Sequence, residues 1–153
     1  MIHTINIAVS RVIDECNIQT SLDLQAMRAR GVEAANVVYD DWVLTEDNST
    51  EVYYSMQEFC ADMVFALRTL IASHSAGKDI ISVDIRNYQG VDLDANTIET
   101  LIRQYLKYRA LSWWYQYRDA DLSVGYGNKA NAALNNIFTQ CMPRSGTACS
   151  RYF

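Results

Sequence analysis

LSWWYQYRD, residues 111–119, puts three aromatic side chains in succession within a stretch whose surroundings predict a helix. Because successive side chains on a helix point about 100° apart, Trp113, Trp114 and Tyr115 cannot all face the same side. A helical projection places six residues on one side of this helix: Ile98, Ile102, Leu106, Ala110, Trp113 and Tyr117. Leu111 and Trp114 fall opposite, so the second half of the helix has almost no face left for solvent.

Two interpretations explain so many rings on one helix. In the first, the helix is central and the rest of the chain covers every side of it. In the second, one aromatic side packs inside and the other contacts another protein, since Trp, Tyr and Arg are typical interface anchors. Arg109 and Gln116 lie near the middle of the apolar arc, where buried polar groups need partners. The candidate interface residues on this helix are Tyr108, Arg109, Trp113, Trp114, Tyr115 and Arg118.

Helical spacing continues on both sides of the aromatic stretch. Residues 122–141 keep it despite two glycines, and Asp119 or Asp121 is the expected N-cap. The small residues of this last helix permit close packing. Upstream, Asn96 and Glu99 have the spacing of a capping box, which predicts the start of the aromatic helix.

The first half of the chain also reads as helical. Asn48 and Glu51 repeat the capping-box spacing and predict a helix from residue 49 to about residue 71, ending near Gly77. Before it, the spacing predicts a short helix over 4–16, a turn at 17–21, and a second helix over 22–44. Gly31 lies within that second helix, and whether it breaks the helix stays open.

One segment has the two-residue period of a strand. Ile81, Val83 and Ile85 alternate with polar residues, and no second strand of equal clarity follows. Its partner is expected in a hairpin through residues 88–93 or on a neighbouring subunit. The predicted fold is therefore mainly α: a bundle of four to five helices with a small β excursion at residues 80–88. We expect one domain over 1–142 and an extended tail over 143–153.

The composition argues against several classes of function. The chain of 153 residues has two histidines and no CxxC pair, phosphate-binding loop or EF-hand spacing. We therefore expect no catalytic residues, no metal and no cofactor, and read at least the first three cysteines as buried hydrophobes: Cys16, Cys60 and Cys141. No apolar run is long enough to span a bilayer and no secretion signal precedes one, so we expect synthesis in the cytoplasm and no membrane partner.

The charge is divided along the chain. Residues 1–99 carry 16 acidic and 6 basic residues, a net −10, whereas residues 100–153 carry 2 acidic and 7 basic, a net +5. Such a division suits contact between copies of the chain or between unlike partners. Ordinary pairing of acidic and basic helices within the chain explains it equally well. The acidic balance of the whole chain argues against nucleic acid as a specific ligand.

The late aromatic helix (YLKYRALSWWYQYRD), the helix after it (LSVGYGNKANAALNNIF) and the tail PRSGTACSRYF together carry a resemblance. Over residues 49–153 the pattern resembles the head-to-tail connector, or adaptor, proteins of tailed bacteriophages, most of all those of phages that infect gut Bacteroidota. The resemblance rests on overall pattern. The small β element that many adaptors carry lacks an identified second strand here.

The resemblance implies a structural, non-enzymatic subunit of the virion neck, assembled in the host bacterial cytoplasm. In that family a homo-oligomeric ring, commonly of twelve subunits, joins the portal protein to tail proteins and lines the DNA channel without reading sequence. The tail positions matching the family's docking segment are Arg144, Arg151, Tyr152 and Phe153. Two alternatives stay open: a cytoplasmic helical interaction or regulatory protein, and a small ligand-binding or enzymatic helical bundle.

Overall fold

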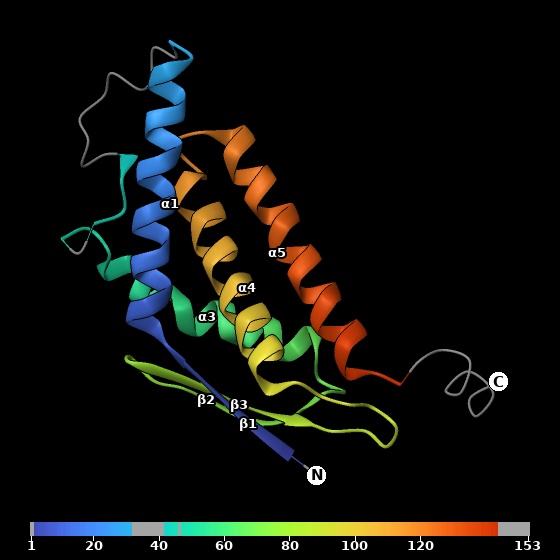
Figure 1. The fold of residues 1–153 in the computed structure, drawn as a ribbon. Helices are drawn as coiled ribbons and strands as arrows, with labels where there is room; N and C mark the ends of the chain where they lie inside the picture. The colour runs from blue at the N-terminus through green and yellow to red at the C-terminus, as the bar shows by residue number, and fades with distance from the viewer. Residues whose placement is uncertain (1, 32–41, 46, 144–153) are drawn as a thin grey trace.

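The computed structural model describes residues 2–31, 42–45 and 47–143 of the chain. Its elements follow in the order β1 (Ile2–Ala8), α1 (Val9–Ala29), α3 (Thr50–Ala66), β2 (Ile71–Ala76), β3 (Ile80–Arg86), α4 (Ala95–Tyr115) and α5 (Ala120–Cys141). The described part is mainly helical, with a small antiparallel sheet at one end of the helices (Figure 1). The predicted class is right, although the β part is larger than expected.

Residues 2–8 form a strand, so the helix predicted to begin at residue 4 is wrong there. β1 pairs antiparallel with β3 over its whole length, from Ile2 opposite Arg86 to Ala8 opposite Ile80. The first residues of the chain fit a two-residue period as well as a helical one, and a short apolar run cannot decide between them. Pairing with a distant strand decides it, because strand preference depends on cross-strand neighbours.

The strand predicted at residues 80–88 is the centre of a three-stranded sheet, since β3 lies between β1 and β2. A tight hairpin joins β2 to β3, where the Gly77 amide donates to the Ile80 carbonyl at 3.0 Å. The helix predicted from residue 49 is present as α3, but its predicted end near residue 71 is wrong, because α3 ends at Ala66 and residues 67–70 turn into β2. The hairpin predicted through residues 88–93 is also wrong; these residues lead from β3 to α4.

α1 is a single helix of 21 residues that runs through residues 17–21, where a turn was predicted. The buried Thr20 is satisfied within it: its hydroxyl donates to the Cys16 carbonyl at 2.9 Å and accepts from the Leu44 amide at 3.0 Å. Gly31, with φ of 68°, follows the end of α1 and is therefore a break. Residues 32–41 of the predicted second helix lie outside the described residues.

Neither predicted capping box forms. Asn48 accepts a hydrogen bond from the Thr45 amide at 2.7 Å, so this contact lies in the loop before α3 and not at its first turn. Asp94, not Asn96, is the N-cap of α4, and its carboxylate accepts from the Asn96 amide at 3.0 Å. Asp119 caps α5, as one of the two predicted candidates. The box spacing marked the helix starts to within a few residues but not the capping side chains.

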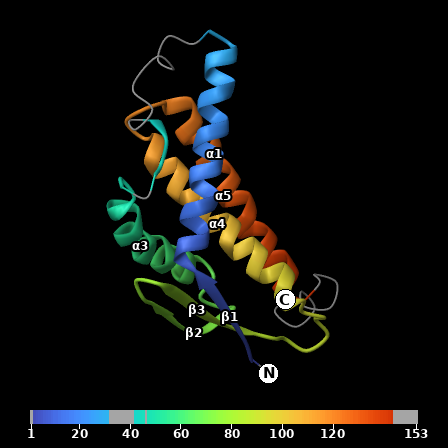
Figure 2. The same cartoon turned by 60° about the vertical axis from the view of Figure 1, so that its left-hand side comes forward.

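α4 lies in the middle of the molecule. It packs against α1, α3, α5 and β1 (Figures 1 and 2). The inner face of the sheet is buried with the helices and carries Ile5, Ile7, Ile81, Val83 and Ile85. The first interpretation of the aromatic stretch, a central helix covered by its own chain, therefore holds for the inward side of α4, which includes Trp114 and Tyr115.

α5 lies close along α4, as its small residues permit. The Ser112 hydroxyl donates to the Ser123 carbonyl at 2.8 Å, and the Ser123 hydroxyl donates to the Ser112 carbonyl at 2.7 Å. A Cβ atom on Gly127 would lie 3.4 Å from the Ser112 hydroxyl oxygen. This close approach fixes the position of the aromatic end of α4 relative to α5.

Candidate interaction surface at the end of α4

The structure places two of the candidate anchors in the core. Trp114 is 4% exposed, and its indole nitrogen donates to the Trp42 carbonyl at 3.0 Å. Tyr115 is fully buried and donates to the Asp23 carboxylate at 3.0 Å. Both side chains are therefore covered by this chain and hydrogen-bonded within it. Neither is exposed as an anchor for a protein partner.

Asp23 accepts a second hydrogen bond, from the Tyr126 hydroxyl at 2.6 Å. One carboxylate on α1 thus holds side chains of α4 and α5 together. Burial, reinforced by Asp23, raises the pKa of both Tyr115 and Tyr126 above the ordinary value, so both hydroxyls stay protonated as donors. Nothing in the sequence indicated that Asp23 had this role.

The rings around Tyr115 form a continuous series of contacts, stacked between Tyr115, Tyr126 and Tyr108 and tilted between Tyr115 and Trp42. Tyr115 lies 5.8 Å from Tyr126 and 6.3 Å from Trp42 between ring centroids, and Tyr126 lies 6.0 Å from Tyr108. We call Trp42, Tyr108, Trp114, Tyr115 and Tyr126 the aromatic layer. It joins the segment before α3 to α4 and α5, and it answers why the quoted stretch is so rich in rings.

The other side of the same stretch faces outward. Trp113 is partly buried, Tyr117 is 90% exposed, and Arg118 is exposed. The Arg118 guanidinium lies 3.7 Å from the centroid of the Trp114 ring and donates to the Trp114 carbonyl at 2.7 Å. Arg118 is thus held against the ring beneath it.

A groove of about 540 Å³ opens at this place, which we call the tryptophan groove. Its lining residues are Trp42, Glu51, Trp113, Trp114, Tyr117 and Arg118. The predicted anchors supply three of them, Trp113, Trp114 and Arg118, whereas Tyr117 was placed on the apolar side of the helix but was not among the anchors. Trp42 and Glu51 were missed. No local pattern could have added these two, because they come from the loop before α3 and its first turn.

Arg109, predicted to need a polar partner, has one. Its guanidinium donates to the Asp62 carboxylate of α3 at 2.7 Å and lies 4.9 Å from the Phe59 ring centroid. Its Nε atom is buried without a hydrogen-bond partner within the described residues. Gln116, the other polar residue of the arc, is exposed. Arg109 is therefore paired within the chain at the edge of the core, and Gln116 is open to solvent.

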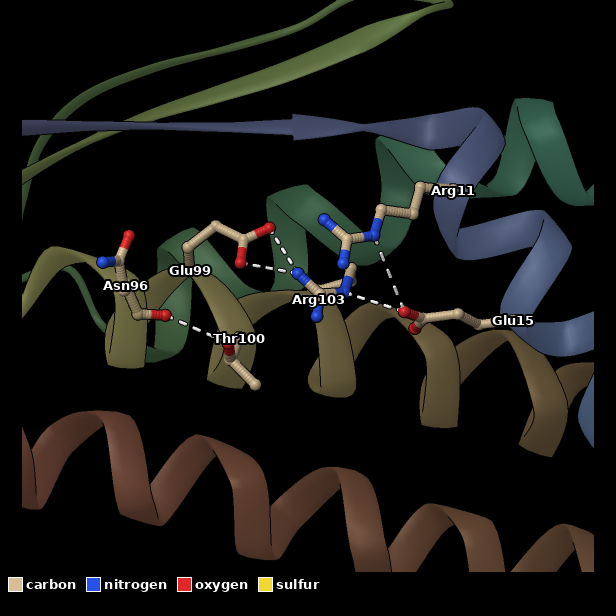
Figure 3. A network of polar contacts seen from close by, with 6 residues as sticks. All are labelled: Arg11, Glu15, Asn96, Glu99, Thr100 and Arg103. Atoms are coloured by element: carbon tan, nitrogen blue, oxygen red, sulfur yellow. Dashed lines mark hydrogen bonds and ion pairs between the residues drawn. The ribbon is translucent and has the colours of Figure 1, made fainter.

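Part of the charge division pairs within the chain. Arg103 of α4 donates to Glu99 of the same helix and to Glu15 of α1, at 2.5 and 2.9 Å. The Arg11 guanidinium lies beside that of Arg103, 3.9 Å from the same Glu15 oxygen (Figure 3). The hydrogen bonds to Glu99 raise the pKa of the Arg103 guanidinium above its ordinary value. Intramolecular pairing therefore explains some of the opposite charge of the two halves.

The first three cysteines are buried thiols, as predicted. Burial raises the pKa of Cys16 to about 12 and that of Cys141 to about 11, and it also raises the pKa of Cys60. A thiol that stays protonated at neutral pH is a poor nucleophile. These three residues therefore act as small hydrophobic side chains.

The tail candidates Arg144, Arg151, Tyr152 and Phe153 lie outside the described residues. Within the described ranges, no three His, Cys, Asp or Glu side chains gather as a metal site. The same part of the chain has no helix with the length and apolar character needed to cross a bilayer. No protein-family model, curated protein or solved structure matches this chain.

Proposed function

We propose that this protein is a structural subunit of a head-to-tail adaptor ring in a tailed bacteriophage, where copies of the chain bridge the portal and the tail. The observation that carries the proposal is the exposure of large apolar side chains on two separate helices. On α3, Tyr54 and Phe65 are each 72% exposed; on α5, Val124 and Phe138 are 64% and 44% exposed.

These two sets lie on different sides of the molecule, because α3 and α5 flank α4 in both views (Figures 1 and 2). A closed ring uses heterologous contacts, in which one surface of each subunit meets a different surface of the next. Two unlike apolar surfaces on one chain suit that arrangement. A twofold dimer, in contrast, needs only one self-complementary surface.

The sheet offers a second means of contact between copies. Within the described residues, β1 and β2 pair only with β3, so the outer edges of both strands keep unpaired backbone groups. Such edges accept a further strand. Edge pairing between neighbouring copies would also satisfy the expectation that the β element is completed across subunits.

The test is quantitative mass spectrometry of nuclease-resistant particles purified from a lysate of the source system, with the capsid protein as the internal standard. We expect about twelve copies of this chain per particle, the number typical of a neck ring in the resembled family. Complete absence from particles that contain portal and tail proteins would overturn the proposal.

A second experiment separates a ring from the cytoplasmic alternative. Mass photometry of the purified chain should detect oligomers larger than a dimer, and replacing Phe65 or Val124 by Ser should weaken them. Gln25→Ser, at an exposed position of α1, is the control and should change nothing. A closed dimer insensitive to both apolar replacements would favour a helical interaction protein unrelated to virions.

A further inference from the structure

The tryptophan groove is built to receive aromatic side chains. All three tryptophans of the chain line it, together with Tyr117, which is 90% exposed. The exposed ring of Tyr117 beside the partly buried Trp113 leaves apolar surface in water at the groove. Aromatic residues of this kind anchor interfaces when a partner covers them.

The groove also has a free acidic group at its rim. Glu51 is exposed, and within the described residues no Lys or Arg lies within ion-pair distance of it. In the sequence around it, residues 40–51 contain five acidic residues and no basic one. The occupant that fits is therefore basic and aromatic.

One segment of this chain has that chemistry. Residues 143–153 contain two arginines and no acidic residue, and Arg151 directly precedes Tyr152 and Phe153. Arg151 would complement the carboxylate of Glu51, and the two rings that follow it would complement the aromatic side chains of the groove. Arg and aromatic residues can moreover stack on tryptophan faces.

The geometry favours the segment of a second copy over the chain's own. α5 begins beside the groove and carries the chain to the opposite end of the molecule (Figure 1). Its 22 residues span about 33 Å at 1.5 Å per residue. The nine residues from Pro143 to Arg151 span at most ~28 Å between Cα atoms when fully extended. The chain's own Arg151 therefore approaches Glu51 only if the whole segment is stretched back along α5, whereas a neighbouring copy is not restricted in this way.

We propose that residues 150–153 of one copy dock in the tryptophan groove of the next, with Arg151 against Glu51 and the rings of Tyr152 and Phe153 against Trp113 and Tyr117. This inference rests on the proposed ring function and deepens it, because it names one heterologous contact between copies. A groove at one end and its occupant leaving from the other produce a head-to-tail series, which closes into a ring when the rotation allows it.

The direct test is a fluorescence titration, in which every tryptophan of the protein reports on the groove. The receptor is the full chain carrying Tyr152→Ser and Phe153→Ser, so that its own tail does not compete. The probe is a peptide of residues 143–153 with an amidated end and Cys149→Ser, which contains no tryptophan. We expect a saturable shift in tryptophan emission with a dissociation constant on the order of 0.1 mM.

Charge reversal tests the assigned ion pair. Glu51→Arg in the receptor should weaken binding at least about tenfold, and an Arg151→Glu peptide should restore much of the loss. Asp14→Arg makes the same charge change at an exposed position of α1 that does not line the groove, and it should leave binding unaltered. Equal binding to all three receptors, or no emission change at millimolar peptide, would overturn the inference.

The oligomeric state connects the contact with assembly. In mass photometry, the full chain with Tyr152→Ser and Phe153→Ser should lose the larger oligomers, and a Glu51→Arg variant should lose them too. Peptide binding without any loss of oligomers would overturn docking between copies. If particles contain a dozen copies but the peptide does not bind, the tail contact falls and the neck assignment stands. If the peptide binds but particles lack the chain, the neck assignment falls and the tail contact stands.

Discussion

The aromatic layer and the outer face of the sheet both join distant segments through side-chain hydrogen bonds, but in different surroundings. In the aromatic layer, Asp23 receives two tyrosine hydroxyls beside the buried rings of α4 and α5. On the sheet, Asp84 of β3 receives the Thr4 hydroxyl of β1 at 2.7 Å and the Ser73 hydroxyl of β2 at 2.5 Å. The second cluster lies at the surface.

The two clusters show how burial determines how much a carboxylate–hydroxyl hydrogen bond contributes to stability. A polar group that loses its partner inside the protein keeps the full cost of leaving water, whereas at the surface water replaces the partner. We therefore expect changes in the aromatic layer to unfold the protein more readily than changes on the sheet. The same contrast holds within the quoted stretch, between the inward Trp114 and the outward Tyr117.

The largest effect is expected for Trp114→Ala. It removes a buried ring and the hydrogen bond to the Trp42 carbonyl, and should lower the free energy of unfolding by about 3–5 kcal/mol. Urea unfolding followed by circular dichroism measures it. Tyr117→Ala, three residues on and 90% exposed, is the matched control and should change the value by about 0.5 kcal/mol or less. Similar losses for both variants would contradict the division of the stretch into an inner and an outer side.

Asp23→Ala should have the second largest effect, about 1–3 kcal/mol, because two tyrosine hydroxyls lose their acceptor. Tyr126→Phe removes only one of the donors and should cost less, on the order of 1 kcal/mol. Both are measured by the same urea unfolding. A loss for Asp23→Ala no larger than that of an exposed replacement would show that water already solvates this carboxylate.

A smaller effect is expected for the Arg109–Asp62 pair, which joins α4 to α3 at the surface of the core. Their side chains are 33% and 51% exposed, so the pair should contribute about 0.2–1 kcal/mol. A double-mutant cycle of Arg109→Met and Asp62→Asn isolates this coupling from the packing of Arg109 on Phe59. Coupling well above this range would place the pair with the buried contacts instead.

The smallest effect is expected on the outer face of the sheet. The hydroxyls of Ser73 and Thr4 lower the pKa of Asp84 below its ordinary value. A carboxyl with a lowered folded-state pKa stabilises the protein above that ordinary value, and the contribution is lost as pH falls through the folded-state pKa. Asp84→Asn should therefore make the loss of stability below about pH 4 less steep. Thr4→Ala, which removes one of the two hydroxyl donors to Asp84, should produce part of the same change.

The helices of the aromatic layer could be predicted because their information is local. α5 keeps its helical spacing from residue 122 to 141, and the spacing around Trp113 to Tyr115 indicated that something must cover every side. The identity of the cover could not be predicted. Trp42 and Asp23 come from segments far away in the sequence, and only the fold brings them to α4.

The sheet was predicted less well for the same reason. β3 carries its own alternation, but β1 fits two periods and β2 has the mixed sequence IASHSA with an irregular register near Ile71. Both become strands because β3 pairs with them on either side. The tryptophan groove was predicted in part: Trp113, Trp114 and Arg118 were candidates from sequence, whereas Trp42 and Glu51 join them only through the fold.

The direct passage from β1 into α1 has a consequence for the order of folding. Ile7 pairs with Ile81, and the ladder continues to the Val9 amide, which donates to the Asp79 carbonyl at 2.9 Å. On the ribosome, β1 emerges roughly 4–15 s before its partner strand, at about 5–20 residues per second. α1 can form its helix during that delay, whereas β1 has no strand to pair with until β3 is synthesised. Sheet closure is therefore a late, non-local step of the kind that slows folding.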